Sequence, residues 1–142
     1  METKYKFNIK LVKKENDIIN NDISYNIIQL SNNKNIGYIE IRPTITPYLY
    51  YLGQIGYHIY PEFRGNNYAY KACLLLFELA KKEYNLNEII ITCSPDNIPS
   101  LKTLNKLNGE LIETIEVPKD HELYYRKEKI KCIFKYDLNK VR

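Results

Sequence analysis

The stretch QIGYHIYPEFRGNNYAYKA, residues 54–72, is the part of the chain around which the other elements can be arranged. Residues 55–60 are rich in β-branched and aromatic side chains and predict a strand, which Pro61 ends because proline cannot donate to a ladder. A polar turn at residues 62–67 follows, and residues 68–82 have the apolar spacing of a helix. The first N–H groups of a helix lack partners within it and attract anions, so the sequence predicts a phosphate-binding turn here.

Upstream, the sequence predicts an antiparallel meander. Residues 5–12 alternate between apolar and polar side chains, as a half-buried strand does. Residues 24–31 and 36–43 are two further strands that flank four turn-forming residues, 32–35, which is typical of a hairpin.

Downstream, residues 88–94 form a short, continuously apolar run. Such a run is typical of a strand buried on both faces and paired in parallel. Residues 54–93 are therefore expected to be a strand–helix–strand crossover.

The last third of the chain predicts one more helix and two strands. Asp96 or Asn97 can cap the helix, and the Asn-Gly pair at residues 108–109 ends it. Residues 110–117 and 128–138 alternate as strands. The predicted order is four strands, helix, strand, helix and two strands, in a single domain that spans residues 1–142.

Three segments are expected to connect these elements and to surround a pocket. Residues 13–23 are polar and fit either a short helix or a loop. Residues 44–52 are aromatic and predict a loop that packs on or over a site, and residues 118–127 predict a polar loop. Tyr48, Tyr50, Tyr51 and Tyr57 are candidates to line such a pocket or to act as an acid, or are ordinary amphipathic packing residues.

Composition and charge narrow the class of protein. With 142 residues the chain is long enough to bury its own core, and 44% hydrophobic with 27% charged residues is ordinary for a globular domain. The net charge of +4 suits an anionic small-molecule ligand but is too weak and dispersed for a nucleic-acid partner.

The three cysteines, Cys73, Cys93 and Cys132, predict buried reduced thiols rather than disulfides or a metal site. Their number is odd, their spacings are wide, and two of them lie in apolar segments. No signal peptide or membrane-length apolar run is evident, so the expected location is cytoplasmic, without a membrane partner.

Two segments together resemble a known family. The turn RGNNYA at residues 64–69, with PEF at residues 61–63 before it, resembles the phosphate turn Q/R-x-x-G-x-G/A of the GNAT superfamily of acetyl-CoA-dependent N-acetyltransferases. The segment DNIPS at residues 96–100, before a leucine-bearing helix and an Asn-Gly pair, is similar to a second family motif. The resemblance covers about residues 36–138, and the chain looks closest to a bacterial group of predicted acetyltransferases of unassigned substrate.

The resemblance implies a fold and an activity. The implied fold is a mixed α+β or α/β one, with a mostly antiparallel central sheet of about seven strands, a central βαβ unit and helices on both faces. The implied activity is direct transfer of the acetyl group of acetyl-CoA to a primary amine of a small molecule or of a peptide or protein N-terminus. Acetyl-CoA would be a cosubstrate, no metal would be needed, and the protein would be a monomer or homodimer.

The resemblance also implies roles for the residues that bind acetyl-CoA. Main-chain amides of the turn would take the pyrophosphate, and the strand before it would pair with the pantetheine arm through Tyr57 and Ile59. Asn97 would hydrogen-bond a pantetheine amide, a role compatible with the alternative of a simple helix N-cap. The turn residues assigned in this way are Arg64, Gly65, Asn66, Asn67, Tyr68 and Ala69.

Three residues are candidates for proton transfer. Ser100 is either the acid that protonates the CoA thiolate or an ordinary first-turn serine. Glu40 and His58 are candidates for the base that deprotonates the acceptor amine. For Glu40 the structural alternative is a pair with Arg42 or a lysine, and for His58 it is a packed strand histidine.

The chain departs from the family pattern at two positions. Asn67 stands where the family has a turn glycine, and asparagine is the other residue most tolerant of positive φ. Leu104 stands where many members have a tyrosine that acts as the acid. These departures leave a second hypothesis open, an acyl-CoA-binding domain of the same fold with little or no catalysis, and a more distant third, a nucleotide- or phosphate-binding module.

Overall fold

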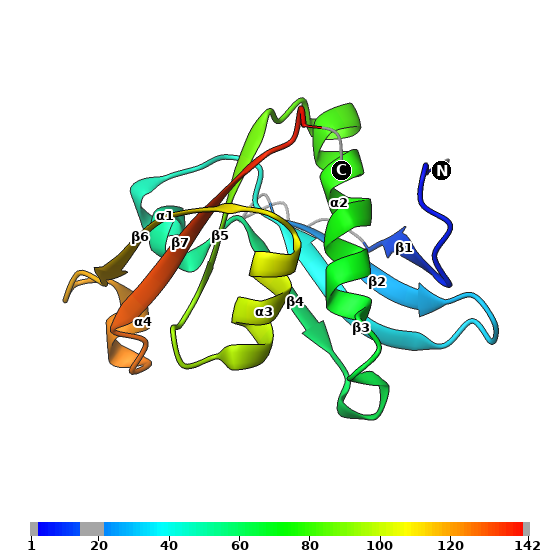
Figure 1. Cartoon of the computed structure of the whole chain (residues 1–142), viewed down its shortest axis with the longest axis horizontal. Coiled ribbons are helices and arrows are strands. Elements are labelled where there is room, and N and C mark those ends of the chain that lie inside the picture. Colours follow the sequence, from blue (N-terminus) through cyan, green and yellow to red (C-terminus); the bar gives the residue numbers. More distant parts are fainter. Residues whose placement is uncertain (1–2, 15–21, 141–142) are drawn as a thin grey trace. The chain divides into compact units, whose positions relative to one another are not determined.

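The structure is a computed structural model that describes residues 3–14 and 22–140 (Figure 1). Residues 15–21 of the predicted connection 13–23 therefore lie outside the described residues. The chain divides into two compact units, which are described one at a time. The first unit combines residues 1–43 with 55–86, and the second combines residues 44–54 with 87–142.

The first unit is a four-stranded antiparallel sheet with one long helix packed against it. The strand order is β1-β2-β3-β4, and each strand pairs with its neighbour in the sequence, as the meander predicts. The strands are β1 (Ile9–Lys13), β2 (Ile23–Gln29), β3 (Asn35–Ile41) and β4 (Ile55–Ile59). The helix α2 (Tyr68–Tyr84) contacts β1, β3 and β4. Its apolar residues, among them Leu76, meet a sheet face of fully buried isoleucines, so the core of this unit lies between helix and sheet.

A one-turn 3₁₀ helix, η1 (Pro61–Phe63), joins β4 to the turn before α2. Pro61 ends β4, as predicted, since it has no N–H to continue the ladder. At the other end of α2, Asn85 adopts a left-handed conformation (φ 56°) and its N–H donates to the Ala80 carbonyl. Asparagine fills this C-terminal position because it tolerates positive φ almost as glycine does.

The second unit is a three-stranded antiparallel sheet with the order β5-β7-β6. Its strands are β5 (Glu88–Cys93), β6 (Glu110–Glu116) and β7 (Ile130–Asp137). Its helices are α1 (Pro47–Leu52), α3 (Ile98–Lys106) and α4 (Glu122–Tyr125).

Helices cover both faces of this second sheet. The hydroxyl of Thr92 on β5 donates to the Tyr51 carbonyl of α1, and the hydroxyl of Tyr136 on β7 donates to the Leu104 carbonyl of α3. Tyr136 lies directly opposite Ile89, three residues before Thr92 on β5. Directly opposite residues of two paired strands point to the same face of the sheet, and residues three apart on one strand point to opposite faces. Thr92 and Tyr136 therefore point to opposite faces, and α1 and α3, which they contact, lie on opposite faces too.

The mixed α/β fold and the seven strands are confirmed, but the strands form two sheets rather than one. The order strand, helix, strand of the predicted βαβ unit is present as β4, α2 and β5. The parallel pairing expected for residues 88–94 is wrong, because β5 pairs antiparallel with β7. Its apolar sequence reflects burial between α1 and α3, which gives the same pattern as a parallel strand.

Gln54, the first residue of the stretch that opened the sequence, belongs to the second unit. Its N–H donates to the Ile90 carbonyl at 2.7 Å, and its side-chain oxygen accepts from the Ile90 N–H at 2.9 Å. A buried glutamine thus satisfies both backbone groups of one β5 residue, which is why it is tolerated at 3% exposure.

Two segments predicted as loops contain short helices. Residues 44–52 include α1, which Thr46 caps by accepting from the Leu49 N–H, with Pro47 in the first turn. Residues 118–127 include α4, which the imidazole of His121 caps by accepting from the Leu123 N–H. Both helices are too short to show a helical period in the sequence, so only the caps distinguish them from loops.

The cysteines are free and buried, as predicted. Burial raises the pKa of the Cys73 thiol to about 12. The pKa of the Cys93 thiol is raised to about 11, and burial is the largest cause. Such thiols are almost wholly protonated near neutral pH.

Within residues 3–14 and 22–140, no helix is both long enough and apolar enough to cross a membrane. No group of three or more His, Cys, Asp or Glu side chains in that part of the chain is arranged to hold a metal ion.

Gly109, which follows α3, is required by close packing. A Cβ atom placed on it would lie 2.5 Å from Cε1 and 2.8 Å from the phenol oxygen of Tyr136. Because Tyr136 is buried and bonded to α3, it has little room to move. We expect Gly109→Ala to lower the free energy of unfolding by about 1–3 kcal/mol in urea denaturation. The exposed neighbour Glu110→Ala serves as the control, and equal unfolding curves for the two variants would contradict this account.

Candidate functional site

The turn before α2 has an open backbone. Gly65 has φ +88°, and no atom lies within 4 Å of the place where a Cβ would be. Asn67, which stands at the glycine position of the family turn, has φ 59° and ψ 24°. The prediction that asparagine can adopt the left-handed conformation there is therefore confirmed. With two left-handed residues separated by Asn66, this short loop can turn its amides toward a ligand without a side chain in the way at Gly65.

The N-terminus of α2 is electrostatically suited to an anion. Asn67 is the N-cap residue, but its side chain makes no capping hydrogen bond, and no acidic residue lies in the first turn. The Asn67 carbonyl accepts the first helical bond, from the Lys71 N–H at 3.0 Å. A 17-residue helix that begins without a carboxylate or a side-chain cap has a partial positive charge at this end.

Tyr68 fixes this helix end against the first sheet. Its side chain is buried, and its phenol oxygen accepts from Gln29 Nε2 at 2.9 Å and from Asn8 Nδ2 at 3.4 Å. Lys71, one turn later, donates to Asn8 Oδ1 at 3.4 Å. The phenol ties the start of α2 to β2, so the side chain of Tyr68 is structural, while its predicted ligand contact concerns only its amide.

The polar side chains within the turn also stabilise it. Arg64 Nε donates to the Ile59 carbonyl at 2.8 Å, across η1, which holds the guanidinium beside the end of β4. Asn66 Nδ2 donates to the Phe63 carbonyl at 3.1 Å. The turn is therefore held by its own residues in the observed shape, and Arg64 places a positive charge next to it.

Tyr57 and Ile59 direct their main-chain groups away from β3. The N–H of Tyr60 donates to the Ile36 carbonyl, its directly opposite partner. Hydrogen-bonded and non-hydrogen-bonded pairs alternate along an antiparallel ladder. Because the 36/60 pair is hydrogen-bonded, Tyr57 and Ile59 belong to non-hydrogen-bonded pairs, and their N–H and C=O groups point away from β3. The bond from Arg64 to the Ile59 carbonyl agrees with this orientation. This is the orientation required for the predicted pairing with a pantetheine arm.

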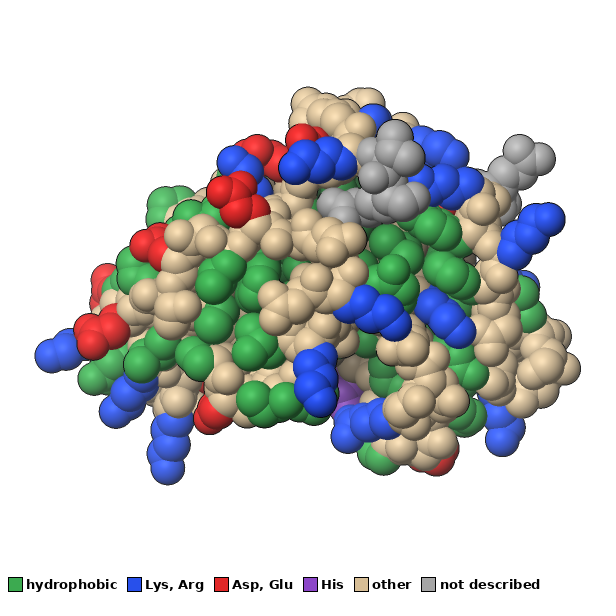
Figure 2. Space-filling view, in the orientation of Figure 1, with side chains coloured by type: hydrophobic (Ala, Val, Ile, Leu, Met, Phe, Trp, Pro, Cys, Tyr) green, Lys and Arg blue, Asp and Glu red, His purple; other side chains and the backbone are tan. Residues whose placement is uncertain are grey.

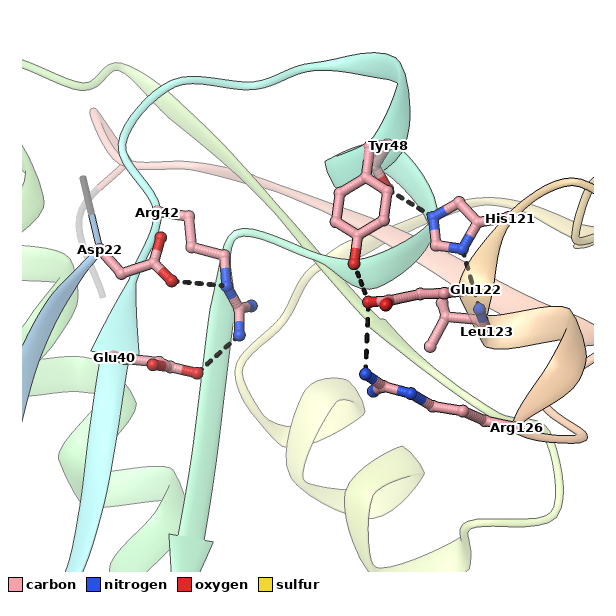
Figure 3. Close-up of polar contacts among 8 residues, drawn as sticks. All are labelled: Asp22, Glu40, Arg42, Tyr48, His121, Glu122, Leu123 and Arg126. Carbon is pink, nitrogen blue, oxygen red and sulfur yellow. Dashed lines mark hydrogen bonds and ion pairs between the residues drawn. The ribbon is translucent and has the colours of Figure 1, made fainter. Parts of the chain in front are cut away.

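The first candidate base, Glu40, is paired. Arg42 Nη2 donates to Glu40 Oε1 at 2.6 Å, and Arg42 Nε lies 3.9 Å from a carboxylate oxygen of Asp22 (Figure 3). The structural alternative of a Glu40–Arg42 pair is thus confirmed. The carboxylate is already engaged by the guanidinium, and the catalytic role of Glu40 stays a prediction.

The second candidate base, His58, lies among aromatic rings. Its ring centroid is 5.7 Å from that of Tyr38, opposite it on β3, and 5.7 Å from that of Tyr60. The side chain is partly exposed, so it remains within reach of solvent. Its role as a base also stays a prediction.

In the second unit, Asn97 and Ser100 share one helix end. Asn97 Oδ1 accepts from the Ser100 N–H at 3.3 Å, which confirms Asn97 as the N-cap of α3. The Asn97 amide nitrogen is exposed and has no partner within residues 3–14 and 22–140, so it remains able to donate to a ligand. Leu104, at the position of the family tyrosine, is 1% exposed and packs in the core of this unit.

A cluster in the second unit that sequence reasoning did not identify joins α1 to α4 (Figure 3). His121 is 8% exposed and stacks on the Tyr48 ring with centroids 4.5 Å apart. Its Nε2 donates to the Tyr48 carbonyl at 2.9 Å while Nδ1 accepts from the Leu123 N–H at 3.1 Å, which fixes the neutral tautomer protonated on Nε2. The Tyr48 hydroxyl donates to Glu122, which also pairs with Arg126 at 3.3 Å.

This cluster brings together two of the three segments predicted to surround an acceptor, residues 44–52 and 118–127. A lone histidine in a polar segment is not by itself evidence of such a contact. The one available signal in the sequence is that His121 directly precedes Glu122. A polar residue followed by an acid is typical of the start of a helix, here α4.

Tyr50, in α1, donates its hydroxyl to Glu113 on β6, and this bond is the main cause that raises the pKa of Tyr50 to about 12. Because the folded pKa exceeds the ordinary value of 10.0, the stabilisation is fully present below pH 10 and is lost as pH rises toward 12. We expect the difference in unfolding free energy between the wild type and Tyr50→Phe to be constant from about pH 7 to 9 and then to shrink. Denaturant titrations across this range check it, with Tyr125→Phe, an exposed tyrosine, as the control. A difference that grows above pH 10 would contradict the assignment.

The basic side chains of the visible face lie at several places. Figure 2 shows Lys and Arg side chains at its edges and in its lower middle part, with apolar and polar side chains around them. This distribution agrees with the expectation of a small anionic ligand, and the predicted absence of a nucleic-acid partner stays a prediction.

Comparison with known proteins identifies the family. The model of an acetyltransferase (GNAT) domain matches residues 3–110. An uncharacterized N-acetyltransferase, YnaD of Bacillus subtilis (strain 168), is 39% identical over 54 residues, which are 38% of this chain and 32% of that protein. The match therefore spans about a third of the curated relative.

Solved structures show the same fold. A GNAT-family acetyltransferase from Bacillus anthracis superposes with a TM-score of 0.66 at 19% identity, over 82% of this chain and 67% of that one. The microcin C7 self-immunity acetyltransferase MccE, solved with acetyl-CoA and AMP, gives a TM-score of 0.59 at 17% identity, over 82% of this chain and 61% of that one. At these identities the likeness concerns the fold alone. Since the family model covers most of the chain, the chain belongs to the acetyltransferase (GNAT) domain family.

Proposed function

We propose that the protein is an N-acetyltransferase that moves the acetyl group of acetyl-CoA directly to a primary amine, without a covalent enzyme intermediate. The observation that carries the proposal is the turn at residues 64–69, with left-handed Gly65 and Asn67 at the uncapped N-terminus of α2. Membership of the acetyltransferase (GNAT) family supports acetyl-CoA as the cosubstrate.

In the first unit, the turn would bind the pyrophosphate. The open space over Gly65 and the absence of first-turn acids fit a doubly charged group held by backbone amides. Arg64 would add a charge-assisted hydrogen bond while its Nε keeps the contact with Ile59. Tyr57 and Ile59 would pair with pantetheine amides as an added strand does.

In the second unit, Asn97 and Ser100 are the residues proposed to contact the pantetheine arm and the thiol of acetyl-CoA. The exposed Asn97 amide would donate to a pantetheine carbonyl, since its oxygen is already used in the cap. The Ser100 hydroxyl would give a proton to the thiolate that leaves when the amine attacks the thioester. Ser100 has this role in the proposal because Leu104, buried and apolar, has no proton to give.

The acceptor is proposed to be a primary amine of a small molecule or of a polypeptide N-terminus. The amine must be neutral to attack, and His58, partly exposed and within β4, is preferred as the base over Glu40, which is held by Arg42. The aromatic and acidic side chains of α1 and α4, such as Tyr48 and Glu122, are the proposed acceptor contacts of the second unit.

Release of free CoA thiol tests the proposal. The protein would be incubated with acetyl-CoA and a panel of primary amines, polyamines, aminoglycosides and peptides with free N-termini, and thiol would be measured together with the mass of the acetylated product. Amine-dependent thiol release with an acetylated product is expected. Tight binding of acetyl-CoA without turnover on any amine would favour the acyl-CoA-binding alternative.

The proposal also includes the organisation of the protein. Residues 1–142 are proposed to act as a single acetyltransferase domain, and the protein is proposed to be a monomer or a homodimer.

Ser100→Ala tests the proton donor. We expect kcat to fall by about 10- to 100-fold with little change in the KM for acetyl-CoA, because the loss concerns the transition state rather than binding. The effect should diminish with a thioester whose leaving thiol is more acidic. Thr103→Ala, one turn further along α3, is the matched control. An unchanged rate in Ser100→Ala would remove Ser100 from the mechanism.

A further inference from the structure

Cys93 and Cys132 are cross-strand neighbours in the second sheet. Cys93 is the last residue of β5, and Cys132 lies directly opposite it on β7. Both are buried, at 4% and 5% exposure, and both are free thiols. Nothing in the proposed acetyl transfer uses either of them.

The ladder places the two residues at a distance that a disulfide can span. The Leu138 N–H donates to the Asn87 carbonyl, so 87/138 is a hydrogen-bonded pair, and alternation along the ladder makes 93/132 another. In such a pair the Cα atoms lie about 5.5 Å apart, within the range of about 4.4–6.8 Å found across disulfides. In a hydrogen-bonded pair the Cβ atoms lie toward the far end of the range of about 4.5–5.5 Å, so they must approach by about 1 Å to reach the 3.5–4.5 Å of a disulfide.

Neighbouring side chains act on both thiols. Cys132 interacts with the Cys93 thiol, and the Thr114 hydroxyl of β6, directly opposite Cys132 on its other side, donates to Cys132 Sγ at 3.7 Å. Lys131, buried beside this pair and bonded to Glu128 at 2.9 Å, is the nearby charge that favours the Cys93 thiolate. Lys131 lowers the pKa of Cys93 less than burial raises it, so the facing arrangement of the two thiols, rather than an acidic thiol, is what favours a disulfide here.

We propose that Cys93 and Cys132 form an oxidation site, which peroxide converts into a reversible disulfide between β5 and β7. Hydrogen peroxide is small and uncharged, so it suits a site with little exposure. The proposal is independent of acetyl transfer.

The chemistry is a two-electron oxidation in two steps. The thiolate of one cysteine attacks the peroxide, the O–O bond breaks, hydroxide leaves, and a sulfenic acid forms. The second cysteine then attacks this sulfur, the S–O bond breaks, the S–S bond forms, and the hydroxyl leaves as water with the thiol proton. One peroxide is consumed and two water molecules are produced. Because the strands must draw together, the disulfide is strained and is reduced readily by dithiothreitol.

Burial is the main cause that keeps the pKa of Cys93 near 11, so the reaction is slow near neutral pH and faster in alkaline buffer. The groups that act on the Cys93 thiol are Cys132 and Lys131 of β7, and Thr114 of β6 donates to Cys132. The oxidation is therefore best followed at about pH 9, where the thiolate fraction is about 100-fold higher than at pH 7.

Thiol counting on the full chain tests the proposal. The reduced protein would be treated with hydrogen peroxide, denatured, alkylated with N-ethylmaleimide and weighed intact, and the peptides would then be mapped. One alkylated thiol of the three and a peptide pair joined through Cys93 and Cys132 are expected, with all three thiols recovered after dithiothreitol. Cys73→Ala should keep the disulfide, and Cys93→Ala and Cys132→Ala should each lose it.

Three results would overturn the proposal. The first is three alkylated thiols after peroxide treatment. The second is conversion of Cys93 or Cys132 to sulfinic or sulfonic acid with no disulfide. The third is a disulfide that joins two molecules rather than two strands of one. The intact mass of the wild type recognises a disulfide between two molecules, and its peptide map distinguishes the other two results, so the test does not depend on how well the variants fold.

Discussion

Asn67→Asp is expected to weaken acetyl-CoA binding by about 10- to 100-fold, or about 1–3 kcal/mol, while the fold becomes no less stable. Aspartate has nearly the shape of asparagine and also tolerates the left-handed conformation that Asn67 adopts. If the pyrophosphate sits on the amides of this turn, the new carboxylate repels it at short range.

The same substitution has the opposite effect on the helix. Residue 67 is the N-cap of α2, and no acid lies in the first turn, so a carboxylate there complements the helix dipole. We expect the unfolding free energy to rise by about 0.3–1 kcal/mol. Affinity and stability that move in opposite directions separate loss of binding from loss of structure.

Asn67→Gly is the matched control for this prediction. Glycine adopts the left-handed conformation without cost and removes the side chain from the place where the phosphates would lie. Acetyl-CoA should bind the glycine variant at least as tightly as the wild type. Calorimetric titration measures all three proteins, and an Asn67→Asp variant that binds as tightly as the wild type would show that the pyrophosphate lies elsewhere.

Arg64→Ala is expected to cost about 10- to 100-fold in affinity for acetyl-CoA, since a charge-assisted contact is worth about 1.5–3 kcal/mol. Arg64 is exposed and is held beside the turn by its bond to the Ile59 carbonyl. The loss should decrease as salt is added, because exposed charges are screened.

A truncated ligand distinguishes this role from a structural one. Acetyl-pantetheine lacks the pyrophosphate, so the wild type and Arg64→Ala should bind it equally. Arg64→Lys keeps the charge without the planar fork and should fall between the two for acetyl-CoA. If Arg64→Ala weakens both ligands by the same factor, Arg64 supports the shape of the turn rather than binding phosphate.

Local chemistry made much of the first unit predictable. Pro61 cannot continue a strand, and Asn67 can adopt positive φ, so the end of β4 and the start of α2 follow from single residues. The same holds for Asn97, whose side chain caps α3 as its place in the sequence predicts. In each case the physical cause acts within three or four residues.

Contacts between distant residues were not predictable in this way. Tyr68 anchors the turn through Gln29, and His121 is positioned by Tyr48, in pairs that lie 39 and 73 residues apart. The direction of β5 was predicted wrongly because an apolar run shows only that both faces are buried, and an antiparallel strand between two helices meets the same requirement.

The acceptor could not be deduced because its proposed contacts belong to α1 and α4, which are six and four residues long. Helices of this length are stabilised by caps and by tertiary contacts such as Tyr48–Glu122, not by a period that a sequence displays.

Calorimetric titration of the wild-type protein with acetyl-CoA, CoA, ATP and NAD tests the central claim most directly. The account predicts saturable one-site binding of acetyl-CoA and CoA, with much weaker or undetectable binding of ATP and NAD, because the pantetheine arm supplies contacts that the other two ligands lack. Equal binding of all four would mark the turn as a general phosphate site, and no binding of acetyl-CoA would contradict the account.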